Sequence, residues 1–256
     1  MEYVMAGLSE PLFWFAMAIA LFAGFVKGTV GFAMPMIMIS AFSSFLSPEL
    51  ALSGLILPTL VTNFGQAFRQ GPAAFWASAC KYWRFLVATV LFIAISAQFV
   101  RDIPQDMFLL MLGVPIMAYA TLQLMGRTLA IKLEHQTRVE WGLGVVAGLY
   151  GGLSGVWGPP LIVYLMSVGV EKIEMLRVQG MIFLLGSVML LSAHLNSGVL
   201  TASSTAFSAV LVIPAVAGMA IGMQVGNRLD QALFRRCTQV LLVLAGLNLV
   251  RRAIGL

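Results

Sequence analysis

One lysine lies deep inside a long run of apolar residues, and its charge is the most chemically informative feature of the chain. Lys27 belongs to the stretch Gly24-Phe-Val-Lys-Gly-Thr-Val-Gly-Phe-Ala-Met-Pro35, and no other lysine or arginine stands so far inside an apolar segment. A charge at the centre of a bilayer costs at least about 2.5–3.5 kcal/mol, so a lysine there usually has a functional role. Lys27 therefore predicts a site for an anion, unless its ammonium group reaches a nearby membrane surface.

The glycines and the proline around Lys27 recur 124 residues later without a gap. A segment interrupted by glycine and proline at matching places in two halves of a membrane chain indicates a transporter's binding site. Irregular backbone at membrane depth is tolerated only where it is buried in protein or lines a cavity. We therefore expect both segments to break at these positions, with the backbone turning at Gly28. Free N–H groups of helix N-termini are expected near Gly28–Gly31 and Gly152–Gly155, where they would favour an anion. The matching residues are Gly24, Gly28, Gly31 and Pro35 in the first copy and Gly148, Gly152, Gly155 and Pro159 in the second.

Polar side chains in other apolar segments complete the predicted substrate site. Asn63 and Gln66 share a helix face because they are three residues apart, and Gln179 opens a later segment. The alternative role for each amide is a hydrogen bond between helices. His194 titrates near neutral pH and is the candidate for a proton relay. The predicted substrate-binding residues are Lys27, Gly28, Thr29, Gly31, Asn63, Gln66, Gly152, Ser154, Gly155, Trp157 and Gln179, and the predicted structural breaks are Pro35, Pro159 and Pro160.

The composition indicates an all-α integral membrane protein. Of the 256 residues, 60% are hydrophobic and only 10% are charged, and the mean hydropathy is +0.96. Soluble domains carry roughly 25% charged residues. The net charge of +5 comes from lysines and arginines scattered between apolar segments, where they anchor loops, so it does not indicate nucleic-acid binding. Cys80 and Cys237 form no spaced motif, and we expect neither a metal nor a cofactor.

Eight apolar segments are visible, and two of them are too long to be single spanning helices. A spanning helix needs about 20 residues, whereas the first segment has 36 and the fifth has 29. These two segments carry the glycine motifs, so we expect each to enter and leave the membrane on the same face. Half-depth helices fit the shorter segment better than two full crossings do. The segments cover about 11–46, 50–68, 85–100, 106–125, 141–169, 178–196, 204–226 and 233–250.

The distribution of basic residues favours two halves of opposite orientation. If all eight segments crossed once, the loop cations would divide eight to six between the two sides. If the two long segments return to the face they entered, eleven cations share one side and only Arg101, Arg251 and Arg252 lie on the other. The second division satisfies the positive-inside rule. We therefore predict an inverted repeat, with residues 1–125 as the first transmembrane repeat, 126–140 as a polar cytoplasmic linker and 141–256 as the second repeat.

With its two glycine motifs in the first and fifth segments, the chain resembles the TauE/SafE family over nearly its whole length. Gly28, Gly31 and Pro35 carry this resemblance in the first half, and Gly152, Gly155 and Pro159 carry it in the second. The resemblance implies a secondary transporter in a prokaryotic plasma membrane. It would export a small anion such as sulfite, a sulfonate or sulfoacetate by alternating access.

Two features depart from the family pattern. The third segment, Phe85–Val100, lacks the expected glycines, and Lys27 stands where the second half has Gly151. The expected partners are the anionic substrate, a proton as coupling ion, the lipid bilayer and a second copy of the chain in a homodimer. No nucleic acid is expected to bind.

Two alternatives to a transporter use the same residues. A passive anion channel could be built on the same scaffold. An intramembrane serine protease is suggested by Gly152-Leu-Ser-Gly155, which matches the Gly-x-Ser-Gly of rhomboid proteases, with His194 as the partner of Ser154. Against a protease, the position matching Ser154 in the first copy is Val30, so the glycines recur without the serine. We expect a protein that is not an enzyme.

Overall fold

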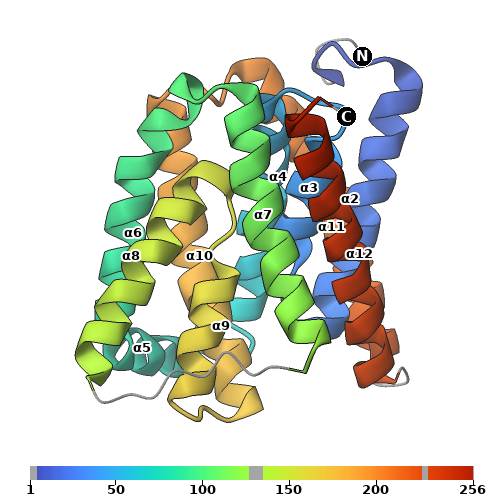
Figure 1. Cartoon of the computed structure of the whole chain (residues 1–256). Helices are drawn as coiled ribbons and strands as arrows, with labels where there is room; N and C mark the ends of the chain where they lie inside the picture. Colours follow the sequence, from blue (N-terminus) through green and yellow to red (C-terminus); the bar gives the residue numbers. More distant parts are fainter. Residues whose placement is uncertain (1–4, 127–134, 227–229, 256) are drawn as a thin grey trace. The chain divides into compact units, whose positions relative to one another are not determined.

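The computed structural model describes residues 5–126, 135–226 and 230–255, and this part of the chain is helical throughout (Figure 1). The chain divides into two compact units, each built from segments of both sequence halves. Unit 1 comprises Met1–Pro58, Arg101–Arg127 and Val199–Leu256, and unit 2 comprises Thr59–Val100 and Thr128–Gly198. The helices are α2 (Glu10–Val30), α3 (Met34–Phe42), α4 (Pro48–Ala67), α5 (Pro72–Lys81), α6 (Trp83–Ser96), the 3-10 helix η1 (Ala97–Asp102), α7 (Gln105–Leu124), α8 (Gln136–Ser154), α9 (Gly158–Ser167), α10 (Lys172–Asn196), α11 (Ala202–Gly226) and α12 (Gln231–Ala253).

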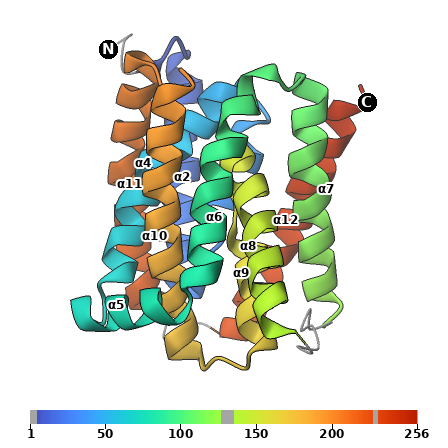
Figure 2. The same ribbon diagram turned by 90° about the vertical axis from the view of Figure 1, so that its left-hand side faces the viewer.

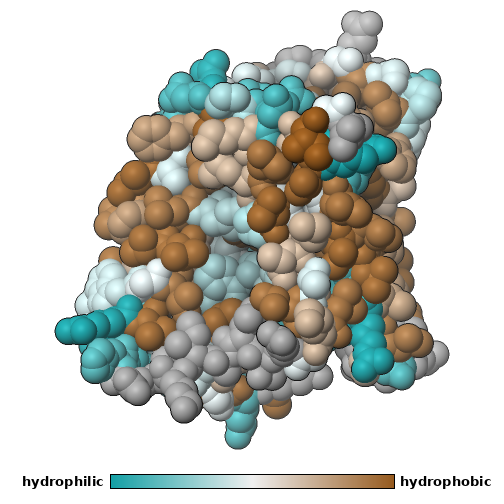
Figure 3. Space-filling model, viewed as in Figure 1, coloured by the Kyte–Doolittle hydropathy of each residue, from teal (hydrophilic) through white to brown (hydrophobic). Residues whose placement is uncertain are grey.

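Seven helices in the described part of the chain are long and apolar enough to cross a membrane, so this is a multi-pass membrane protein. Hydrophobic residues make up much of the face shown in Figure 3. The third span is longer than the sequence indicated, because η1 extends α6 to a 20-residue apolar rod. The seven candidate spans are Glu10–Val30, Pro48–Ala67, Trp83–Asp102, Gln105–Leu124, Ile173–Asn196, Ala202–Val225 and Ala232–Ala253.

Three helix pairs make the main contacts inside the units. In unit 1, α2 packs along α11 and α7 packs along α12; in unit 2, α6 packs along α8 (Figures 1 and 2). Glycines make the α2–α11 contact close. A Cβ atom at Gly24 would lie 2.1 Å from the carbonyl oxygen of Ala215, and one at Gly28 would lie 2.2 Å from that of Met219. No larger residue fits without moving backbone, as expected for small-residue seams between membrane helices.

The α8–α6 contact in unit 2 is made by the matching glycines of the second motif, which again lie against carbonyl groups of the partner helix. A Cβ atom at Gly148 would lie 2.6 Å from the carbonyl oxygen of Thr89, and one at Gly152 would lie 2.6 Å from that of Ile93. Thr89 and Ile93 precede Ala215 and Met219 by 126 residues, nearly the spacing of the glycine motifs. Matching glycines in the two units therefore meet carbonyls at matching positions of the partner helix.

The missing glycines of the third segment have a structural explanation. In unit 1 both helices supply glycine, since a Cβ atom at Gly222 of α11 would lie 2.2 Å from the Phe25 carbonyl oxygen. In unit 2, α6 instead supplies hydroxyl groups: Thr89 Oγ1 donates to the Gly144 carbonyl (3.3 Å) and Ser96 Oγ donates to the Gly148 carbonyl (3.2 Å). Small hydroxyl side chains keep the helices close and add hydrogen bonds across the seam.

Each glycine motif ends one helix and leads into a short helix that runs back beside it (Figure 1). In unit 1, α2 ends at Val30, and Gly31 adopts φ 87°. In unit 2, α8 ends at Ser154, and Gly155 adopts φ 70°. Glycine adopts this left-handed conformation without a steric penalty. We call Gly31–Ala33 and Gly155–Trp157 the first and second reversals.

The helices before and after each reversal differ in length. The returning helices α3 and α9 are short, with 9 and 10 residues. In the first long segment, the 21 residues of α2 form a rod of about 32 Å, long enough to cross the hydrocarbon core. Helix α5 is an addition that no apolar segment predicted. It lies across the ends of its neighbours in unit 2 in both views (Figures 1 and 2).

Alanine substitutions at the seam glycines test the close packing. We expect Gly28→Ala and Gly152→Ala each to lower the melting temperature of the purified protein by several degrees, because overpacking costs about 1–3 kcal/mol. Gly142→Ala is the matched control on α8, since a Cβ atom there meets nothing within 4 Å. Thermal unfolding in detergent measures all three variants. Equal melting temperatures for Gly152→Ala and Gly142→Ala would contradict the packing described.

Candidate functional site

The first reversal follows directly from a buried lysine. Lys27 is only 2% exposed and lies in the last turn of α2, where the negative end of the helix dipole favours a cation. The N–H of Gly31 donates to the Lys27 carbonyl oxygen (2.7 Å) and closes the turn. Thr29 Oγ1 donates to the Phe25 carbonyl (2.9 Å) on its own helix. The structure thus gathers Lys27, Gly28, Thr29, Gly31 and Pro35 in one stretch of unit 1.

Gly28 has a different role from the predicted one. The sequence suggested that the backbone turns there, but Gly28 is helical and packs on the Met219 carbonyl of α11. The chain turns three residues later, at Gly31. The same holds for Gly152, which packs on α6 three residues before the turn at Gly155. Both glycines are therefore packing residues whose place is fixed by the neighbouring helix.

A second correction concerns the polarity of the helix ends. We expected free N–H groups of helix N-termini near Gly28–Gly31 and Gly152–Gly155. These residues instead form the C-terminal ends of α2 and α8, and the N–H groups of Gly31 and Gly155 are bonded to the carbonyls of Lys27 and Gly151 (both 2.7 Å). The helix N-termini at the reversals belong to α3 and α9, which begin three residues after Gly31 and Gly155.

Ala33, just before α3, has a strained backbone. It adopts φ 78° although it is not a glycine, and it is buried. A left-handed alanine costs roughly 1–2 kcal/mol, and such outliers cluster at ligand-binding and switch regions. Pro35 occupies the first turn of α3, where its fixed φ suits a helix start. The first reversal therefore combines backbone strain with the buried cation.

The two reversals place their large side chain at different positions of the repeat. In the repeat, Gly151 matches Lys27 and Trp157 matches Ala33. The ring of Trp157 covers Gly151 so closely that a Cβ atom there would lie 2.8 Å from the ring atom Cε3. Trp157 also contacts Phe183 of α10, with ring centroids 6.1 Å apart. An indole thus fills the second reversal, whereas the first has a lysine beside a small residue.

The comparisons with known proteins assign the family. The family model described as "Sulfite exporter TauE/SafE" matches residues 16–249, which is most of the chain. The chain belongs to the TauE/SafE family. No curated protein and no solved structure matches it.

As a TauE/SafE protein the chain is a membrane transporter of the sulfite-exporter type and not an enzyme, and the contacts of Ser154 and His194 fit this assignment. Ser154 Oγ donates to the Tyr150 carbonyl (2.6 Å) and accepts from the N–H of Val156 (3.1 Å). His194 Nε2 lies 3.0 Å from the Gly152 carbonyl oxygen. Because a carbonyl only accepts, Nε2 carries the proton and cannot serve as a base. Both side chains stabilise the end of α8, and the relay role of His194 stays a prediction.

The predicted amides lie between α4 and α10 of the TauE/SafE protein, within unit 2. Asn63 is fully buried, and its Nδ2 donates to Ser187 Oγ (3.0 Å). Gln66 Nε2 donates to the Leu176 carbonyl (3.2 Å). Both therefore make the interhelical hydrogen bonds that were the alternative to substrate binding. Gln179 on α10 is buried as well, and its Oε1 atom has no hydrogen-bond partner.

A buried acid escaped the sequence analysis, which placed Glu140 in the polar linker. In the structure Glu140 is 3% exposed and lies on α8, with Oε2 3.7 Å from Nη1 of Arg84. A hint was available, because the apolar segment begins at the next residue, Trp141. Much of that linker, residues 127–134, lies outside the described residues.

A network of polar side chains connects α5 and α10 in unit 2. Lys81 Nζ donates to Glu174 Oε1 (2.7 Å), and the hydroxyl of Tyr82 donates to the same oxygen (3.0 Å). The hydrogen bond to Glu174 raises the pKa of Lys81. Arg177 Nε donates to Ser78 Oγ on α5 (2.8 Å). These contacts explain why Arg177 anchors the start of α10 rather than lining a site.

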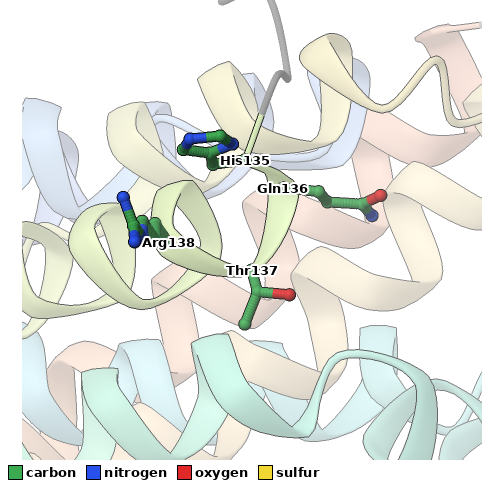
Figure 4. Close-up of a pocket in the computed structure, with 4 residues that line it drawn as sticks. All are labelled: His135, Gln136, Thr137 and Arg138. Carbon is green, nitrogen blue, oxygen red and sulfur yellow. The ribbon is translucent and has the colours of Figure 1, made fainter.

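An open hollow lies beside the start of α8 and is lined by four consecutive residues, His135, Gln136, Thr137 and Arg138 (Figure 4). Their side chains point in different directions, so they do not converge on one point. The hollow includes none of the predicted substrate-binding residues. No group of three His, Cys, Asp or Glu side chains in the described ranges could hold a metal ion.

Substitutions at the first reversal test its backbone strain. We expect Ala33→Gly to leave the melting temperature unchanged or raised, because glycine relieves the left-handed strain. The matched control is Ala18→Gly, an exposed position in the middle of α2, which should lose about 1 kcal/mol. Gly31→Ala should lower the melting temperature, since it places a Cβ atom at φ 87°. Equal losses for Ala33→Gly and Ala18→Gly in detergent would rule out the strained conformation.

Proposed function

We propose that this chain moves sulfite or a small sulfonate across a prokaryotic plasma membrane by alternating access around the two reversals. Membership of the TauE/SafE family supports transport of a sulfite-type anion. The observation that carries the proposal is the buried Lys27 beside a glycine reversal of unit 1. A lysine buried within an apolar segment favours an anion as its partner.

An inverted repeat is part of the proposal, and the counterpart helices support it. Helices α7 and α12 begin with the same Gln-x-x-Phe pattern and pack together in unit 1. They are antiparallel, because Gly113 contacts Gly246 while Gln123 Oε1 accepts from Arg235 Nη2 (2.7 Å). Two copies related by a two-fold axis in the membrane plane would pair their counterparts in this way.

The α4–α10 contact in unit 2 gives independent support. Asn63 and Ser187 are 124 residues apart, which is the spacing of the glycine motifs, and they are bonded to each other at 3.0 Å. A residue near a two-fold axis contacts its own counterpart. The shared register of α2–α11 and α8–α6 agrees with the same relation. The two long segments would then enter the membrane from opposite faces.

The chemistry of the proposed site suits a small oxyanion. Sulfite and sulfonates present three oxygens that accept hydrogen bonds, and Lys27 would supply the countercharge. First-turn N–H groups of a helix have no intrahelical acceptor and favour anions. At the first reversal, α3 offers the N–H of Met36 in that position. At the second, Pro159 and Pro160 remove two donors from α9, so the first reversal is the stronger anion site.

The proposed substrate-binding residues differ in how directly they would contact the anion. Lys27 and the N–H groups of the first reversal would bind it, because an anion needs hydrogen-bond donors. Gln179 of unit 2 would contact an anion only through its Nε2 group, since its Oε1 is an acceptor. Gly28, Gly152, Asn63 and Gln66 would shape the site through helix packing.

Removing the charge of Lys27 tests the anion site. We expect Lys27→Ala to lower sulfite transport in proteoliposomes at least tenfold, which corresponds to about 1.4 kcal/mol, and Lys27→Arg to retain more activity because it keeps the charge. Lys81→Ala removes an exposed lysine and is the matched control. Transport by Lys27→Ala at the wild-type rate, with equal protein in the membrane, would contradict the proposal. Sulfite accumulation against its gradient under a pH difference excludes the passive channel.

A further inference from the structure

The carboxyl group of Glu140 is buried in unit 2, and one of its two oxygens, Oε1, has no hydrogen-bond partner. Oε2 lies 3.7 Å from Nη1 of Arg84, which is longer than a hydrogen bond. Glu174 shows the contrast, because its Oε1 accepts from both Lys81 and Tyr82. A buried carboxylate without full partners is costly in its charged form. Arg84 therefore favours the charged form of Glu140, whereas burial favours its neutral form.

Aromatic residues from two other helices, Phe85 of α6 and Tyr164 of α9, lie beside this carboxyl group. Tyr164 of α9 interacts with Glu140 through its hydroxyl group, and its ring stacks on Phe85 of α6 with centroids 5.5 Å apart. The Tyr82 ring packs edge-on against the Tyr164 ring, with the ring centroids 6.1 Å apart. The titratable and charged groups facing Glu140 are thus Arg84 from α6 and Tyr164 from α9, with Tyr82 behind Tyr164.

We propose that Glu140 binds and releases the proton that drives anion transport, which rests on the proposed function. Protonation supplies the missing partner by turning the carboxylate into a hydrogen-bond donor. Protonation would alter the contact between Glu140 and Tyr164. Tyr164 belongs to α9, a ten-residue helix that begins directly after the second reversal. A proton bound at Glu140 would in this way act on the backbone segment that the substrate approaches.

The hollow in Figure 4 gives this site a route to water. Gln136 lines the hollow and stands one helical turn before Glu140 on the same face of α8. Its side chain also interacts with the hydroxyl group of Tyr164. Gln136 and Tyr164 therefore link the hollow to the buried carboxyl group through groups that donate and accept hydrogen bonds.

Separating exchange from driven transport tests the proposal. Sulfite exchange between proteoliposome lumen and medium at equal pH needs no net proton movement, whereas accumulation under a pH difference does. We expect Glu140→Gln to keep exchange within about threefold of wild type and to lose at least tenfold in driven accumulation, one decade corresponding to about 1.4 kcal/mol. Glu174→Gln is the matched control and should keep both.

The other outcomes of this experiment are decisive. Driven accumulation retained by Glu140→Gln would show that the proton travels on sulfite or on His194, and would overturn the proposal. Loss of exchange as well would make Glu140 a structural or substrate-binding residue, which also overturns it. Absence of any sulfite transport by the wild-type protein would be a failure of the proposed function instead.

Infrared spectroscopy tests the proton site without using transport. A carboxyl group that is protonated on acidification shows a C=O stretching band apart from those of carboxylates. We expect the difference spectrum of the purified wild-type protein and of Glu174→Gln to contain a buried-carboxyl band that Glu140→Gln lacks. The same band in all three proteins would overturn the assignment to Glu140.

Discussion

The close approach of glycine to a neighbouring helix backbone is the constraint on which the rest of this structure depends. At Gly28 and Gly152 a single added Cβ atom would collide with a main-chain carbonyl of the partner helix. These contacts fix how far α2 and α8 can slide along α11 and α6. Because the register is fixed, the place where each helix ends is fixed as well, three residues further along at a glycine with positive φ. The position of Lys27, one residue before the contact at Gly28, is a consequence of the same packing.

Two units built in one register nevertheless differ in chemistry at their reversals. Trp157 fills the second reversal and leaves room only for hydrogen at Gly151. At the first reversal the large residue is Lys27 and the small one is Ala33, so a charged side chain is present there and the indole is absent. The proposed function requires a countercharge for a small anion, and Lys27 would supply it at the first reversal. The asymmetry of the repeat therefore agrees with the proposed function.

The sequence predicted the features that depend on chemistry local to the chain. The glycines and prolines of the two motifs predicted interrupted segments, since glycine conformation and proline geometry act over a few residues. The turn expected at Gly28 lies three residues later, at Gly31. Partners from distant segments could not be predicted. The roles of Gly28 and Gly152 depend on carbonyls of α11 and α6, and the burial of Glu140 depends on Arg84 and Tyr164 from other helices. Helix α5 was missed because it is short and mixes polar with apolar residues.

The orientation of the two halves is the central claim, and labelling of single cysteines tests it most directly. The native Cys80 and Cys237 are replaced by serine, and one cysteine is introduced at Ser9, His135 or Ile254 in separate variants. A membrane-impermeant maleimide is then applied to intact cells and to lysed cells. The account predicts that the cysteines at positions 9 and 254 react in intact cells, and that the one at position 135 reacts only after lysis. Reaction of all three positions from the same side of the membrane would contradict the inverted repeat, and with it the proposed site.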